Sequence, residues 1–122
     1  MATILTQVGE EWIIDKFQET VQTLPEWIDW GTGAGTAAKG DTALFTEASE
    51  DRVQGTLSQP VADKLRCVGT MVCAGAGKTI TNAGLFPIST KATGPLIIHG
   101  DFTGIALNVG DKIEFTIEYE QT

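Results

Sequence analysis

The clearest pattern in this sequence is a strict alternation of apolar and polar residues near its C-terminal end. The apolar positions are Ile113, Phe115, Ile117 and Tyr119. The polar positions between and around them are Lys112, Glu114, Thr116, Glu118 and Glu120. A period of two residues is typical of a β-strand that buries one face and exposes the other to water. Residues 113–119 are therefore predicted to form such a strand.

A different period runs through the N-terminal region. Apolar residues recur there at steps of four, four and three, at Ile13, Phe17, Val21 and Leu24. This spacing places them on one face of a helix, so an amphipathic helix is predicted over residues 10–24. Glu10 and Glu11 suit the positive end of its dipole, and Pro25 is expected to end it.

Shorter segments with β-like patterns fill most of the remaining chain. They are residues 27–31, 52–57, 65–74, 79–86, 96–99 and 101–107. Residues 65–74 are apolar on both faces, which favours a central strand. The small residues of 31–40 predict a loop and those of 75–78 a turn. Between 41 and 51 only Leu44 and Phe45 are apolar neighbours, which would anchor this loop to the core.

Short strands with turn signals about every ten residues, together with fourteen glycines, favour an all-β architecture. We expect an antiparallel β-sandwich, a jelly roll or a barrel, with one amphipathic helix at the N-terminus. The length of 122 residues suits one domain. Within that single domain, residues 1–26 form the helical segment and residues 27–122 the β-rich core.

The charge balance narrows the classes of partner. Eight basic residues against sixteen acidic ones give a net charge of -8, which would repel nucleic acid and anionic membranes. The sequence has no apolar run long enough to span a membrane and no signal-peptide pattern in residues 1–8. Cys67 and Cys73 lie six residues apart on one predicted strand, about 20 Å at ~3.3 Å per residue. We therefore expect free thiols in a reducing cytoplasm.

Two glycine-rich segments resemble nucleotide-binding motifs and fail their tests. Residues 75–79 end in Gly-Lys-Thr, but the P-loop needs a further glycine where Val72 stands, and a helix after it. Residues 31–38 allow a weak match to the dinucleotide fingerprint, yet no helical pattern follows. A hairpin turn and a loop are the better interpretations, and no cofactor is expected.

Catalytic and metal-binding constellations are also weakly supported. His99 is the only histidine in the sequence. It would share a strand face with Asp101, and the two could form a weak acid–base couple. The alternative is a histidine at the end of a strand, beside a turn, with no chemical role. An acidic cluster, Asp41, Glu47, Glu50 and Asp51, lacks calcium-loop spacing and is expected to be a solvated loop face. The sequence therefore predicts a protein that is not an enzyme and has no metal site.

Large aromatic residues in the first quarter of the chain are the candidates for a partner interface. They are Trp12, Phe17, Trp27 and Trp30. Tryptophan is enriched at interface hot spots, but it also packs cores, and both roles stay open for each one. If the tryptophans were exposed, they would also suit a small carbohydrate-binding module.

Three segments of the sequence resemble small virion structural proteins of tailed bacteriophages. The first is Trp30-Gly-Thr-Gly33 followed by Asp41-Thr-Ala-Leu-Phe-Thr-Glu47 and Arg52. The second is Ile80-Thr-Asn-Ala-Gly-Leu-Phe86, and the third is Leu107-Asn-Val-Gly-Asp-Lys-Ile-Glu-Phe-Thr116. Their order and spacing together carry the resemblance.

The resemblance implies a capsid decoration, or cement, protein that binds the outer shell and stabilises contacts between major-capsid subunits. A tail or fibre component for host recognition is the alternative. It also implies a β-sandwich or jelly-roll core, a homo-oligomer, partners among the virion proteins, and location in the virion after synthesis in the bacterial cytoplasm. No catalytic residues are implied.

Overall fold

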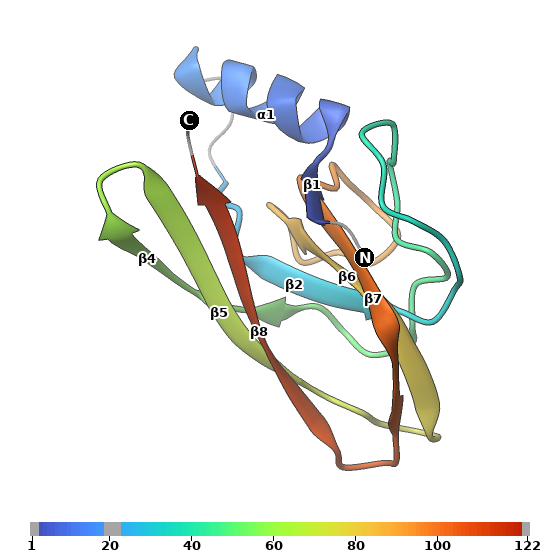
Figure 1. Cartoon of the computed structure of the whole chain (residues 1–122). Coiled ribbons are helices and arrows are strands. Elements are labelled where there is room, and N and C mark those ends of the chain that lie inside the picture. The colour runs from blue at the N-terminus through green and yellow to red at the C-terminus, as the bar shows by residue number, and fades with distance from the viewer. Residues whose placement is uncertain (1–2, 19–22, 121–122) are drawn as a thin grey trace.

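The computed structural model of the chain describes residues 3–18 and 23–120, which form two antiparallel sheets and one helix (Figure 1). The five-stranded sheet has the order β1 (Thr3–Leu5), β7 (Ile98–Leu107), β6 (Lys78–Phe86), β2 (Trp27–Gly31) and β3 (Val53–Gln54). The three-stranded sheet has the order β4 (Thr56–Val61), β5 (Lys64–Val72) and β8 (Lys112–Glu120). Helix α1 (Gln7–Phe17) lies at one end of the two sheets. The predicted mainly β, sandwich-like fold with one N-terminal helix is confirmed.

One hydrophobic core joins both sheets and the helix. Its buried members are Trp12, Ile28, Trp30, Ala48, Cys67, Met71, Cys73, Ile80, Ala83, Leu85, Ile97, Ile98 and Leu107. A second, smaller cluster contains Leu44, Phe86 and Leu96, with Trp27 packed against it. Leu44 therefore anchors the long loop before β3 to the body of the domain, as predicted.

The helix is shorter than predicted and begins earlier. Thr6 is its N-cap, with its hydroxyl oxygen accepting a hydrogen bond of 3.0 Å from the Gly9 N–H. The helix ends at Phe17, where the Gln18 N–H closes the last turn on Asp15 and Lys16 carbonyl oxygens. The extension to Leu24 is wrong, because that residue lies in irregular chain; Val21 lies outside the described residues. The capping threonine, four residues before the predicted start, is the signal that the apolar pattern missed.

Two strand boundaries differ from the prediction. Residues 98–107 form one continuous strand, so the predicted break between residues 96–99 and 101–107, with a turn beside His99, is wrong. The pairing of this strand with β6 instead shifts register between Ile80 and Asn82. Residues 52–57 are divided between β3 and β4, which belong to different sheets. The chain changes sheet at Gly55, where an added Cβ would lie 2.5 Å from the Cys67 sulfur. A glycine is required there by this close approach.

The predictions for the two most regular strands are confirmed. β5 is the middle strand of its sheet, and β8 alternates, with Ile113, Phe115 and Ile117 packed against the core. These three side chains are only partly buried, because β8 lies at a sheet edge.

Replacing Phe115 with alanine is expected to lower the free energy of unfolding by about 2 kcal/mol. The side chain is half-buried, and its ring lies 6.3 Å from that of Trp30 and 6.2 Å from that of Phe102, measured between centroids. Urea denaturation of the variant measures the loss. The matched control is Glu118→Gln on the opposite face, which removes a surface ion pair and should cost less than about 1 kcal/mol. Equal effects of the two substitutions would contradict the assigned facing of β8.

Candidate functional site

The four aromatic residues proposed from the sequence do not form one surface. Trp30 on β2 is completely buried, and Trp12 on α1 is 9% exposed. Trp27 is half-buried against the smaller cluster. Phe17 alone is well exposed, at 77%. Trp30 is therefore a core residue that no partner reaches in this conformation, and Phe17 is the candidate whose side chain is most accessible.

Trp12 and Phe17 meet at a mostly apolar pocket beneath the helix. The pocket has a volume of about 300 Å³. Its walls come from α1, from Pro25, and from both sheets: Leu85 belongs to the five-stranded sheet and Leu65 to the three-stranded one. The indole N–H of Trp12 is buried and has no hydrogen-bond partner among the described residues. This end of the sandwich is thus less tightly filled than its centre.

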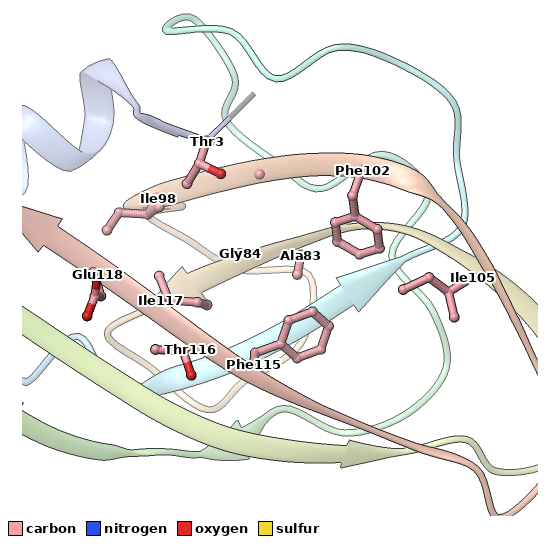
Figure 2. Close-up of a pocket in the computed structure, with 11 residues that line it drawn as sticks. Thr3, Ala83, Gly84, Ile98, Phe102, Ile105, Phe115, Thr116, Ile117 and Glu118 are labelled. Carbon is pink, nitrogen blue, oxygen red and sulfur yellow. The ribbon is translucent and has the colours of Figure 1, made fainter. Parts of the chain in front are cut away.

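A second apolar cleft lies between the two sheets beside β8 (Figure 2). It has a volume of about 260 Å³. Phe115 and Ile117 of β8 point into it from one side, and Ile98, Phe102 and Ile105 of β7 line the other. The cleft marks the side on which the sandwich is open.

Exposed large apolar side chains gather at two opposite ends of the molecule. The helix end has Ile14, Phe17, Leu24 and Val61, which are 49–77% exposed. The hairpin end has Val72, Ile105 and Val109, which are 42–59% exposed. In Figure 1 helix α1 lies at the top and the β7–β8 turn at the bottom, so the strands separate the two patches.

The densest polar cluster surrounds Asp29, a carboxylate in the middle of β2 that is completely buried. Both of its oxygens accept hydrogen bonds from Lys91, at 3.0 and 2.8 Å, and Arg52 lies 3.4 Å away. Glu47 contacts the same Lys91 at 3.0 Å. The cluster joins β2 to two long loops, and sequence inspection missed it.

Burial and charge act in opposite directions on the two acids of this cluster. Burial, with a hydrogen bond to Glu47, raises the pKa of Asp29 to about 7, although Lys91 opposes the shift. Burial would also raise the pKa of Glu47, but hydrogen bonds with Asp29, Lys91 and the Ala92 N–H lower it to about 2. Glu47 therefore carries the negative charge that balances Lys91 across the ordinary pH range.

Arg52 extends this cluster into a clamp on the loop after β6. Its guanidinium donates hydrogen bonds to the Ile88 and Thr93 carbonyl oxygens at 3.0 and 2.6 Å. The same group stacks 3.6 Å from the centre of the Phe86 ring. The cluster is a structural clamp, because its donors and acceptors already satisfy one another.

Glu50 makes a second buried polar site, at the junction of the two sheets. Its carboxylate accepts hydrogen bonds from the Trp30 indole N–H and from the Ala74 N–H, both at 2.9 Å, and forms an ion pair with Lys78. Burial would raise the pKa of Glu50, but the Ala74 N–H, Lys78 and Trp30 together lower it to about 2. Lys78, the lysine of the Gly-Lys-Thr sequence, is thus an ion-pair partner at the start of β6.

His99 is the centre of a third buried site. Its Nδ1 lies 2.7 Å from Asp41 and its Nε2 lies 2.9 Å from the Asn82 amide oxygen. The Phe45 backbone fixes that amide, since its N–H donates to the oxygen and its carbonyl accepts from the nitrogen, both at 3.0 Å. The partner of His99 is therefore Asp41, and not Asp101, whose side chain accepts a hydrogen bond from the Ala37 N–H.

The predicted acidic cluster is divided among these sites. Asp41 binds His99, Glu47 binds Lys91, Glu50 binds Lys78, and Asp51 remains exposed. The prediction of one solvated face is therefore wrong for three of the four residues. Within the described part of the chain, no group of three histidine, cysteine or acidic residues is placed to hold a metal ion.

Cys67 and Cys73 are both buried free thiols, as predicted. Burial raises the pKa of Cys67 to about 11, with a contribution from the charge of Glu26. Among residues 3–18 and 23–120, no helix has the length and apolar character needed to cross a membrane. Comparison with known protein families, with curated proteins and with solved structures found no match to this chain.

Proposed function

We propose that the chain is a structural protein of a bacteriophage virion, most specifically a decoration protein that binds the outer shell and bridges major-capsid subunits. The three-segment sequence resemblance motivates the proposal. The observation that supports it in the structure is the pair of exposed apolar patches at the helix end and the hairpin end.

Two separated patches suit a bridging role. Exposed large apolar side chains that gather in patches, as the phenylalanine and three valines do at the two ends of this sandwich, are typical of surfaces that contact a partner. A protein that stabilises an assembled shell must contact two neighbouring subunits at once, and it acts by binding the assembled state in preference to the separated one. The buried clamps around Asp29 and Glu50 would keep the two patches at a fixed separation.

The proposal is tested by locating the chain on purified virions of the phage that encodes it. Mass spectrometry and cryo-electron microscopy should find it on the shell in copy numbers set by capsid symmetry. Its presence at the tail would support the alternative of a tail or fibre component. Its absence from the particles would refute both.

Replacing Phe17 with serine is expected to weaken binding to shells by about tenfold while leaving the melting temperature nearly unchanged. The side chain is too exposed to stabilise the monomer appreciably. Binding is measured by cosedimentation with capsids that lack the chain. Glu11→Gln, an exposed position on the same helix, is the matched control and should bind as the original protein does.

The same assay applied to Val109→Ser tests the bridging role. Val109 is 59% exposed in the β7–β8 turn, far from the helix. A bridging subunit should lose affinity when either end is altered. Loss confined to one end would show single-ended attachment instead. We do not propose the carbohydrate-binding alternative, because none of the three tryptophans is well exposed.

A further inference from the structure

The two sheets have four edges, and three of them are protected against pairing with another strand. β1 and β3 are only three and two residues long. β4 has a register shift between Ser58 and Val61 and contains Pro60, which lacks an N–H. β8 is different, because its nine residues pair with β5 without interruption and contain no proline. A long, regular edge strand is a template for pairing with a further strand.

The unequal widths of the sheets leave room beside this edge. Three strands face five, so β7 and β1 extend past β8 on the open side of the sandwich. The cleft of about 260 Å³ lies there, with Phe102 and Ile105 on its β7 wall (Figure 2). A fourth strand added next to β8 would place its inward side chains over this cleft and bury it.

We infer that the edge of β8 pairs with β8 of a second copy of this chain, forming a two-fold symmetric dimer with a continuous six-stranded sheet. The β8 sequence fits itself when the axis passes through Thr116. In that antiparallel register Phe115 faces Ile117 of the other copy and Ile113 faces its Tyr119, all on the cleft side. All nine residues of β8 are paired with β8 of the other copy, and the apolar faces of the two strands lie on the same side of the joined sheet.

Charge complementarity supports the same register. It places Lys112 opposite Glu120 of the other copy, twice in each dimer. Both residues lie at exposed positions of β8, and neither side chain forms an ion pair with a described residue of its own copy. The register also opposes Glu114 to Glu118, which is unfavourable, but Glu118 is already neutralised by Arg66 at 2.6 Å and Lys64 at 3.7 Å. Those two cations also lower the pKa of Glu118, chiefly through the Arg66 hydrogen bond.

Sedimentation equilibrium over a range of concentrations tests the dimer, and charge reversal tests its register. The original chain should dimerise. Lys112→Glu and Glu120→Lys should each weaken dimerisation by about tenfold, because each converts two attractive cross-strand pairs into repulsive ones. The double variant exchanges the charges and should recover most of the affinity. Circular dichroism confirms that each variant is folded.

Hydrogen exchange gives an independent measurement on the unaltered protein. Backbone amides of β8 should become better protected as the concentration rises, while those of the β4 edge should not change. A chain that stays monomeric throughout would overturn the inference. So would a dimer that is insensitive to both charge reversals, or one whose double variant is no tighter than the single variants. The inference does not depend on the proposed function, since shell binding by a monomer would leave that proposal standing.

Discussion

Replacing Glu50 with alanine is expected to lower the free energy of unfolding by about 3–5 kcal/mol, although the residue lies in a loop. Its side chain is only 6% exposed and joins the Trp30 indole, the Ala74 backbone and the Lys78 ammonium group. The substitution leaves the Trp30 indole N–H buried without an acceptor and leaves Lys78, only 14% exposed, without its counter-charge. Urea denaturation at neutral pH measures the loss. Asp51→Ala, at the exposed neighbouring position, is the control and should be nearly neutral.

Glu50→Gln separates the charge of this residue from its shape. The pKa of Glu50 is lowered from 4.5 to about 2 in the folded protein. An acid with a lowered pKa stabilises the fold above its unfolded value, and that stabilisation is lost as the pH falls from about 4.5 to about 2. The charge therefore contributes up to about 3 kcal/mol at neutral pH.

The glutamine variant should accordingly be less stable than the original protein at pH 7 and should approach it in stability near pH 2. Thermal melts over this pH range measure the difference. A difference that stays constant with pH would mean that the glutamate acts through its hydrogen bonds alone.

The strands of this fold follow from local sequence patterns more closely than its helix does. The alternation in β8 and the two apolar faces of β5 predicted both strands correctly. Residues two apart in a strand lie on the same face of the sheet, so the sequence shows which face is buried. The helix was misplaced because its start depends on one capping hydroxyl at Thr6 and not on the apolar period. Local patterns thus predicted the sheets better than the ends of the helix.

The polar sites could not be predicted in the same way, because each joins residues far apart in the sequence. Asp41 is 58 residues from His99, and Glu50 is 28 residues from Lys78. One local signal was available, since Asp29 stands inside the apolar strand Trp27–Gly31. A carboxyl group at such a position either pairs with a cation or keeps its proton, and the raised pKa of Asp29 beside Lys91 reflects both tendencies. The pattern identifies the need for a partner, but only the fold identifies Arg52 and Lys91.

Replacing Arg52 with methionine is expected to lower the free energy of unfolding by about 3–5 kcal/mol. The arginine side chain is 1% exposed, and methionine fills much of its volume without the guanidinium. Asp29 then keeps only Lys91 as a cation, and the Ile88 and Thr93 carbonyl oxygens lose their donor. The loop after β6 should exchange its amide hydrogens faster, which hydrogen exchange at residues 88–93 measures. Arg66→Met is the matched control, because that arginine is 39% exposed and its ion pair is worth about 1 kcal/mol or less.

A double substitution distinguishes the penalty of a buried carboxylate with one cation fewer from the loss of the clamp itself. Most of the cost of Arg52→Met should come from leaving Asp29 buried beside fewer cations, so Asp29→Leu in the same chain removes that cost. The double variant should therefore be less destabilised than the sum of the two single variants, by about 1 kcal/mol or more. Additive effects would mean that the carbonyl hydrogen bonds and the Phe86 stacking carry the stability. In that case Arg52 would hold the loop directly, and Asp29 would be held in the core by Lys91 alone.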